Sequence, residues 1–177
     1  MIRDRVIRPA HQSDSEKIAQ TYVASWQATY QGILPGSYLA GLRVERSAYL
    51  VRMALSDPQS LCLIAEEGQA VVGYAFAGPE RNHDPVYRAE LYDLYLLPQV
   101  QRQGLGKQLL AEMARRLQQA HYNTLRVWVL ALNPSRHFYE KRGGIYIGSK
   151  SIVFAGRRLK VDAYGWIDIT LTMENAD

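Results

Sequence analysis

Apolar residues along the chain follow two spacings, one typical of helices and one typical of strands. Over 13–30 and 105–120 they recur every three or four positions, which places them on one face of a helix. Two further helices are expected over 38–55 and 135–142. Shorter apolar runs, bounded by glycine, proline or polar residues, predict strands. These runs are 6–10, 61–66, 70–77, 89–97, 125–130, about 145–154 and about 159–171.

The order of these elements predicts how neighbouring segments connect. Gly68 lies in a short turn between two strands, which is typical of an antiparallel hairpin. The strand that ends at Leu97, the helix after it and the next strand form a crossover unit, and such a unit joins parallel strands. Ser13, with Glu16 three residues further on, fits a capping box at the start of the first helix.

Length and composition indicate one folded domain over residues 1–177. Apolar residues make up 47% of the chain and charged residues 21%, which is close to the average for globular proteins. No apolar stretch approaches the ~20 residues of a membrane span, and no apolar signal segment follows the charged amino terminus. We therefore expect a cytoplasmic protein. The single cysteine, Cys62, lies in an apolar run and is interpreted as a buried core thiol.

Positive charge is concentrated in the second half of the chain. Residues 91–177 carry 12 Lys and Arg against 7 Asp and Glu, whereas residues 1–90 carry 9 against 10. A basic half attracts anions such as nucleic acid, membrane phosphate or a polyanionic cofactor. The basic residues form no arginine-rich block, so nucleic acid is not indicated. The histidines show no metal-ligand spacing, and no Gly-x-Ser-x-Gly elbow points to a hydrolase.

A glycine-containing loop, 101–106, links a predicted strand directly to the start of an amphipathic helix. Main-chain N–H groups of such a loop, together with the helix amino terminus, are able to bind a pyrophosphate, and Arg102 and Lys107 lie beside it. A simple connecting turn is the alternative. The Walker pattern fails because Gln108 follows Lys107, and the dinucleotide fingerprint fails because Leu109 stands where its third glycine would be.

The residues around this loop resemble a known family. The run 94–110, with Gln101, Gly104 and Gly106 in the order Q/R-x-x-G-x-G/A, resembles the acyl-coenzyme A binding motif of the GNAT family of N-acetyltransferases. Further matches follow in family order and extend the resemblance over nearly the whole chain. They are Asn133, the sequence Phe-Tyr-Glu-Lys-Arg-Gly at 138–143, the opening strand at 6–10, and the Trp26-x-x-x-Tyr30 part of the first helix.

The resemblance implies an α/β, acyl-coenzyme A N-acyltransferase fold. Its sheet would be mixed and mainly antiparallel, parallel only between the strands near Leu94 and Val127, which splay apart where acyl-coenzyme A enters. The implied activity is transfer of an acetyl or other short acyl group from acetyl-coenzyme A (acetyl-CoA) to a primary amine, by direct attack and without a metal. A sensor that binds acyl-coenzyme A without turning it over is the alternative. A nucleic-acid-binding domain is a third hypothesis.

The resemblance also implies which residues contact the acyl donor. Main-chain amides would bind the pyrophosphate, and the pantetheine arm would pair with the backbone of Leu96 and the side chain of Asn133, which is equally interpreted as a helix cap. A backbone N–H near Leu96 or Leu97 would stabilise the developing oxyanion. The expected set is Leu96, Leu97, Gln101, Arg102, Gln103, Gly104, Leu105, Gly106, Lys107 and Asn133.

Two catalytic roles follow from the same resemblance. Tyr139 matches the family's general acid, because a phenol stays protonated at neutral pH and is able to protonate a leaving thiolate. Glu90 is expected to be the general base, with Asp93 as the rival. Regular alternation along the strand would place residues 90 and 92 on one side of the sheet and residue 93 on the other.

The acceptor pocket is expected between the first two helices and the central strands. Trp26, Tyr30, Tyr92 and the more distant Tyr164 are its candidate residues, although each is also a plausible core aromatic. The acceptor itself, a small-molecule or peptide amine, is not specified by the sequence. Homodimers are frequent in the family. Gly144 departs from the family pattern, in which an aromatic residue usually follows the glycine at this point.

Overall fold

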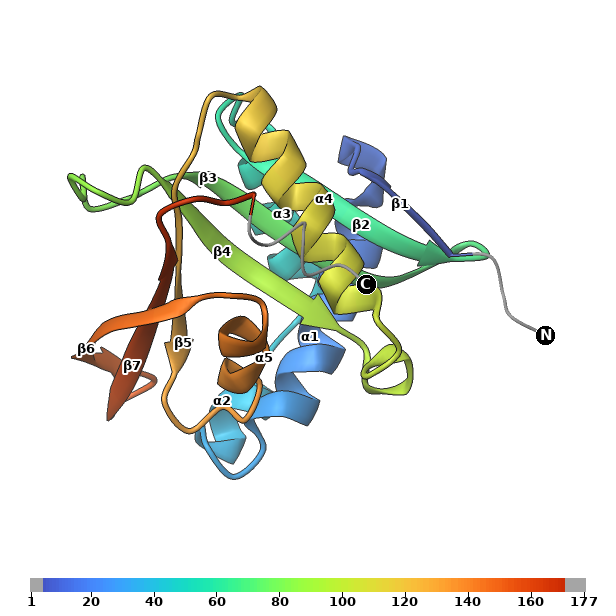
Figure 1. The fold of residues 1–177 in the computed structure, drawn as a ribbon. Helices are drawn as coiled ribbons and strands as arrows, with labels where there is room; N and C mark the ends of the chain where they lie inside the picture. Colours follow the sequence, from blue (N-terminus) through green and yellow to red (C-terminus); the bar gives the residue numbers. More distant parts are fainter. Residues whose placement is uncertain (1–4, 171–177) are drawn as a thin grey trace.

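The strands form one twisted seven-stranded sheet in the order β1-β2-β3-β4-β5-β7-β6 (Figure 1). The computed structural model describes residues 5–170. All the predicted strands are confirmed in order, but the last one ends earlier than predicted, at Trp166 rather than at Leu171, because the described residues 167–170 form a bend and turn. Leu171 itself lies outside the described residues. The strands are β1 Arg5–Pro9, β2 Leu61–Glu67, β3 Ala70–Pro79, β4 Ala89–Leu96, β5 Leu125–Leu130, β6 Ile145–Phe154 and β7 Arg157–Trp166.

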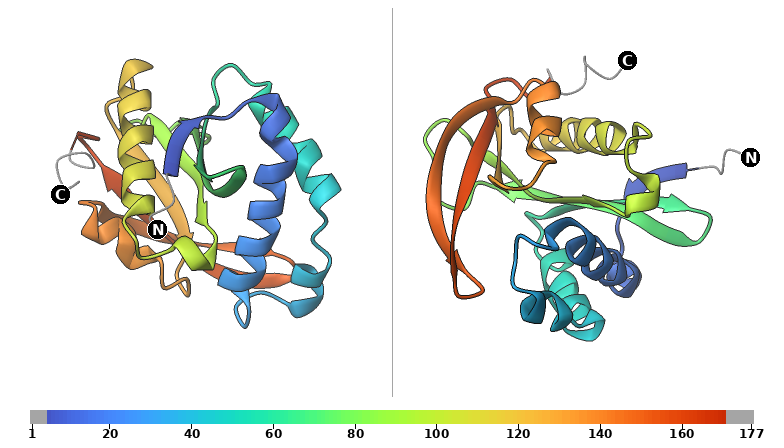
Figure 2. Two further views of the ribbon diagram at one scale, coloured as in Figure 1. Left: turned by 90° about the vertical axis from the view of Figure 1, so that its right-hand side faces the viewer. Right: turned by 90° about the horizontal axis from the view of Figure 1, so that it is seen from below.

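The helices cover both faces of this sheet. Viewed along its edge, α4 and α5 lie on one face and α1, α2 and α3 on the other (Figure 2). Buried leucines of α4 pack on one face, and Ile18 of α1 packs with Tyr74 on the other. None of the helices in residues 5–170 is long and apolar enough to cross a membrane. The helices are α1 Ser15–Tyr30, α2 Gly36–Ala40, α3 Val44–Leu55, α4 Leu105–Gln119 and α5 Arg136–Lys141.

The predicted parallel pair is confirmed, and it is short. Strands β4 and β5 pair in parallel only between Ala89–Leu91 and Leu125–Val127, while every other strand pairing is antiparallel. Helix α4 makes the connection between the two strands. Beyond Leu91 the strands no longer pair, so a gap opens between the carboxyl-terminal halves of β4 and β5.

Two details of the helices differ from the prediction. The helix expected over 38–55 is divided into α2 and α3, because Arg43 adopts an extended conformation with φ −127°. The capping box of Ser13 is wrong. The Asp14 carboxylate instead accepts the His11 N–H at 2.7 Å and pairs with Arg8 at 2.8 Å, so a short 3₁₀ turn, Gln12–Asp14, precedes α1.

Gly144 has no side chain because its neighbours occupy the space. A Cβ atom there would lie 2.8 Å from the Trp166 ring and 2.9 Å from the Tyr139 carbonyl oxygen. Trp166 comes from β7, is 1% exposed, and donates its indole N–H to the Arg142 carbonyl at 2.8 Å. An aromatic ring therefore packs at the end of α5, but β7 supplies it.

We expect Gly144→Ala to lower the free energy of unfolding by about 1–3 kcal/mol, because the added methyl group overlaps backbone and a fully buried ring. Urea denaturation measures the change. The matched control is Gly36→Ala at the start of α2, where a Cβ meets nothing within 4 Å. Equal stability of the two variants would contradict this account of Gly144.

Candidate active site

The loop between β4 and α4 presents a run of free amides. Gly104 precedes the first residue of α4 with φ +82°, and Arg102 also has a positive φ, +58°. These left-handed residues turn the chain so that the main-chain N–H groups from Arg102 to Lys107 make no hydrogen bond within residues 5–170. Free amides at a helix amino terminus are suited to an anion such as a pyrophosphate.

Of the two backbone N–H groups that the sequence offered for the oxyanion, those of Leu96 and Leu97, only one is left without a partner in the β3–β4 pairing. The Leu97 N–H donates to the Val72 carbonyl at 2.9 Å, so it is already used by the β3 pairing. Backbone groups alternate along a strand, so the N–H of Leu96 points the other way, toward the gap. The Gln101 side chain donates to the Leu96 carbonyl at 2.9 Å and joins the loop to this edge.

A β-bulge changes the side of the sheet on which Asp93 lies. Phe76 pairs with Asp93 and Ala77 with Leu91, so Tyr92 is an extra residue in β4. The expected alternation is therefore wrong. Because cross-strand partners share a face, Asp93 lies on the side of Phe76, which belongs to the cluster packed beneath α1.

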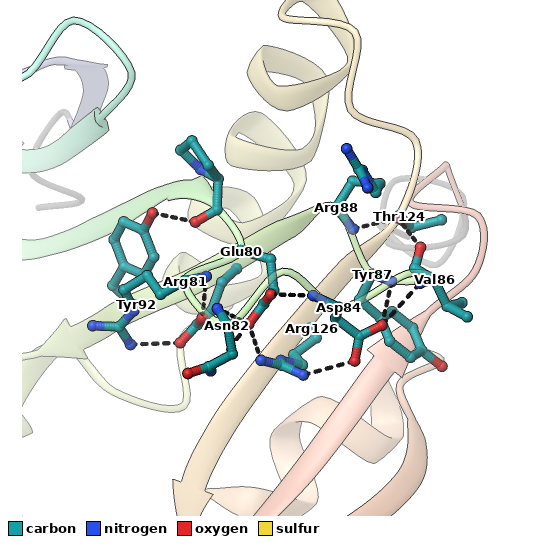
Figure 3. A network of polar contacts seen from close by, with 12 residues as sticks. Glu80, Arg81, Asn82, Asp84, Val86, Tyr87, Arg88, Tyr92, Thr124 and Arg126 are labelled. Carbon is teal, nitrogen blue, oxygen red and sulfur yellow. Dashed lines mark hydrogen bonds and ion pairs between the residues drawn. The ribbon is translucent and has the colours of Figure 1, made fainter.

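Glu90 forms an ion pair with Arg81. It is 1% exposed, and one carboxylate oxygen accepts from the Arg81 guanidinium at 2.5 Å, while the other accepts the Arg81 N–H at 3.3 Å. The same guanidinium lies over the Tyr92 ring, 4.5 Å from its centroid, and the Tyr92 hydroxyl donates to the Pro79 carbonyl at 2.6 Å. Glu90 and Tyr92 thus hold Arg81 before β4. Figure 3 shows Arg81 beside Tyr92.

Asp93, in contrast, is partly buried and has no partner. Within residues 5–170 its carboxylate forms no hydrogen bond or ion pair. Burial raises the pKa of Asp93 to about 6, and the nearby charge of Arg81 opposes that rise. An unpaired carboxylate that titrates near neutrality has the properties of a general base.

Tyr139 approaches the same point from α5. It is 7% exposed and packs against Phe138, Tyr164 and Trp166 with ring centroids 5.2 to 6.3 Å away. Burial raises its pKa, and Tyr30 and Asp93 add to the rise, so the hydroxyl stays protonated. No hydrogen bond to that hydroxyl occurs within the described part of the chain.

The candidate acceptor residues separate into two groups. Trp26 and Tyr30 lie together, 4.8 Å between ring centroids, and the Tyr30 hydroxyl is 2.7 Å from that of Tyr95, which sequence reasoning missed. Tyr92 packs on Arg81 instead. Tyr164 lies with Tyr139 and donates to Glu140 at 2.8 Å. The alternation of side chains along β4 is the one sequence signal that could have placed Tyr95 beside Tyr30, and the bulge at Tyr92 interrupts that alternation.

Asn133 acts as a cap in this structure. Its side-chain oxygen accepts the Ser135 N–H at 2.9 Å, its carbonyl accepts the Arg136 N–H at 3.1 Å, and it is 5% exposed. The cap interpretation therefore has direct structural support. Contact with an acyl donor stays a prediction.

A buried charge network that the sequence did not reveal anchors the loop before β4 (Figure 3). The Arg126 guanidinium of β5 pairs with Glu80, and with Asp84 at 2.9 Å. Glu80 also accepts the N–H groups of Asn82 and Asp84, at 2.8 and 2.6 Å. This loop carries Arg81, the cation whose charge lowers the pKa of Asp93, so the network positions the segment that holds it.

No group of three or more potential metal ligands occurs among residues 5–170. Cys62 is buried, and burial raises the pKa of its thiol, so it is an inert core residue. A shallow, open cleft lies between α1 and the β2–β3 turn, lined by Lys17, Thr21 and Leu97 among others. It touches neither Asp93 nor Tyr139.

Comparison with known proteins gives a consistent result. A model of the acetyltransferase (GNAT) family matches residues 21–144. The chain is 34% identical over 164 residues to the uncharacterized N-acetyltransferase YuaI of Bacillus subtilis (strain 168), covering 93% of this chain and 94% of that protein.

Two solved structures of similar fold contain coenzyme A. One is the PaiA N-acetyltransferase of Thermoplasma acidophilum in complex with coenzyme A (TM-score 0.67, 22% identity, 90% of this chain and 98% of that one). The other is yncA, a putative acetyltransferase of Salmonella typhimurium, with acetyl-CoA (TM-score 0.68, 20% identity, 92% and 93%).

A sheet that splays beside one parallel strand pair is the fold that the chain shares with these solved acetyltransferases. The chain belongs to the acetyltransferase (GNAT) family. It transfers an acetyl group from acetyl-CoA to an amine acceptor, which confirms the predicted enzyme and acyl donor.

Asp93→Asn should stabilise the protein. The folded-state pKa of about 6 exceeds the ~3.9 of a free aspartate, so the charged form is disfavoured in the folded state and stability is lost as pH rises from 4 through 6. Because Asp93 is in partial contact with solvent, we expect the free energy of unfolding of Asp93→Asn to exceed that of the wild type by about 1–2 kcal/mol at pH 8. The difference should be smaller at pH 5.

Urea denaturation at both pH values measures this difference in the free energy of unfolding. Glu90→Gln is the control, because it weakens the buried pairing with Arg81 and should lower stability. An Asp93→Asn variant less stable than the wild type at pH 8 would show that the carboxylate has a partner.

Proposed function

We propose that the transfer uses Asp93 as general base and Tyr139 as general acid. The observation that carries this assignment is that the Asp93 carboxylate of β4, beyond the end of the β4–β5 pairing, and the Tyr139 hydroxyl of α5 both lie without a hydrogen-bond partner in residues 5–170. Burial raises the pKa of Tyr139, and the charges of Tyr30 and Asp93 add to that rise. Glu90, the base expected from the sequence, is held in its pair with Arg81. Its role as base stays a prediction, which the rate measurements below test.

In the proposed reaction the acceptor arrives as an ammonium ion and gives a proton to Asp93. The neutral amine attacks the thioester carbonyl carbon, and the C–S bond breaks. The N–H of Leu96 faces the gap and is suited to stabilise the developing oxyanion. Tyr139 gives its proton to the leaving sulfur, and the second proton of the attacking nitrogen restores the Tyr139 hydroxyl. Asp93 then releases the proton that it accepted, so each turnover gives one proton to solvent.

We also propose that the amides of 102–107 bind the pyrophosphate of the acyl donor. Arg102, Gln103, Leu105 and Lys107 would contribute main-chain N–H groups, and the left-handed Gly104 brings them to one point. Gln101 would act by holding the Leu96 carbonyl, and Gly106 by leaving room beside Leu96. The gap beyond Leu91 accommodates the pantetheine arm.

The acceptor class, location and assembly are proposals of the same kind. The acceptor would be a small-molecule or peptide amine in the cytoplasm. Strand β6 forms one edge of the sheet and exposes Ile145, Tyr146 and Val153, which is consistent with a homodimer through that edge.

Acetyl-CoA binding tests the pyrophosphate loop. Gly104→Asp and Gly104→Asn both tolerate the left-handed conformation and have nearly the same shape, but only aspartate adds negative charge. Isothermal titration calorimetry should show that Gly104→Asp loses at least about tenfold more affinity than Gly104→Asn. Equal losses would place the pyrophosphate elsewhere.

The pH dependence of turnover identifies the base. The wild-type kcat/KM should fall below a midpoint near pH 6, because protonated Asp93 accepts no proton. Asp93→Asn should lower kcat/KM by about 10²–10⁴-fold. In Glu90→Gln, kcat/KM should still fall below about pH 6, as expected for the wild type. Thiol release from acetyl-CoA with a panel of amines measures both. If the fall of kcat/KM at low pH disappeared in Glu90→Gln but not in Asp93→Asn, the base would be Glu90.

Tyr139→Phe should lower kcat by about 10²-fold or more and leave acetyl-CoA affinity unchanged, because only the hydroxyl proton is removed. Calorimetry and turnover together separate the two effects. Tyr164→Phe, a neighbouring phenol bonded to Glu140, is the control and should retain most activity. Unchanged turnover in Tyr139→Phe would exclude it as the acid.

A further inference from the structure

An aromatic wall surrounds Trp26 on the side of the sheet that carries α1. Its rings come from α1, α2, β4 and β6, and each has its centroid 4.8 to 6.3 Å from that of Trp26. Apart from Tyr30, all of them are partly exposed, so solvent reaches part of each side chain. The aromatic wall consists of Tyr22, Trp26, Tyr30, Tyr38, Tyr95 and Phe154.

Asp93 lies at the edge of the aromatic wall. It precedes Tyr95 by two residues, beyond the bulge, so both side chains are on the same face of β4. Tyr95 contacts Tyr74 and Tyr30 with ring centroids 6.0 and 6.4 Å away. The carboxylate therefore lies beside the rings, at the point where β4 leaves β5.

The charge of Asp93 is not compensated by its surroundings. The hydroxyls of Tyr30 and Tyr95 bond to each other rather than to the carboxylate. Arg81, the cation that acts on Asp93, is bound to Glu90. A partly buried carboxylate without a partner costs free energy, and a cation that binds there removes that cost.

We propose that the aromatic wall and Asp93 select a primary alkyl- or arylalkylammonium acceptor with no carboxylate beside the amine. This proposal rests on the proposed function of the same site and adds the substrate class. Aromatic faces attract cations by about 0.5–2 kcal/mol each. The α-carboxylate of an amino acid would instead approach the uncompensated charge of Asp93 and be repelled.

Binding of a non-reacting probe tests the charge preference apart from acetyl transfer. Choline and 3,3-dimethylbutan-1-ol have nearly the same shape, differ by one positive charge, and contain no amine N–H. Titration followed by tryptophan fluorescence, with coenzyme A present and absent, should show at least about tenfold tighter binding of choline. Equal binding of the two probes would overturn the proposal.

Variants assign the preference to these residues. Asp93→Asn should abolish the difference between the probes, and Tyr38→Leu should weaken choline binding about fivefold or more. Tyr49→Leu is the matched control, because Tyr49 is 59% exposed on α3 and lies outside the aromatic wall. A preference for choline that survives Asp93→Asn would also overturn the proposal.

Tyramine and tyrosine extend the test to turnover, since they differ only in the carboxylate. We expect a kcat/KM for tyramine at least about tenfold higher, with the ratio reduced in Asp93→Asn. Equal values would overturn the substrate class while leaving the transferase assignment intact. If choline binds in an Asp93-dependent way but no amine releases thiol from acetyl-CoA, the proposed function fails and the cation site stands.

Discussion

The early separation of β4 from β5 is the constraint on which the site depends. Parallel pairing ends at Leu91, and the strands diverge from there. If pairing continued, the Leu96 N–H would be bonded within the sheet, and backbone would separate Asp93 from Tyr139. In the proposed reaction the gap would serve both as an entrance for the acyl donor and as a passage between groups on opposite faces of the sheet.

The packing beside the gap keeps it narrow and defined. A Cβ atom at Gly73 of β3 would overlap the Leu96 side chain, so Leu96 lies tightly against the neighbouring strand. On the other side, Gly106 leaves room beside Leu96 and Phe138, with 3.4 and 3.6 Å to a Cβ placed there. A Cβ at Gly106 would therefore make ordinary contacts, and of the two positions only Gly73 requires a glycine for Leu96 to pack where it does.

Asp93 differs from the other buried carboxylates in having no ion-pair partner within residues 5–170. Asp14 is paired with Arg8, Glu90 with Arg81, and Arg126 with two carboxylates. Asp93, in contrast, forms no hydrogen bond or ion pair within residues 5–170, and only the more distant charge of Arg81 acts on it. Stability would favour a partner for Asp93, whereas the proposed role of Asp93 as general base needs a carboxylate without one. An uncompensated group of this kind is the type of feature that proteins retain at functional sites at the expense of stability.

Sequence alone predicted the succession of strands along the chain, the crossover unit, the glycine-containing loop before α4 and the family, because hydrophobic periodicity and glycine placement are local properties of the chain. It did not reveal the bulge at Tyr92, the pairing of Glu90 with Arg81, or the neighbourhood of Tyr95 and Trp26. Those depend on cross-strand register and on contacts between distant segments. One extra residue in β4 moved Asp93 to the other face, and only the folded sheet could decide which carboxylate remained free.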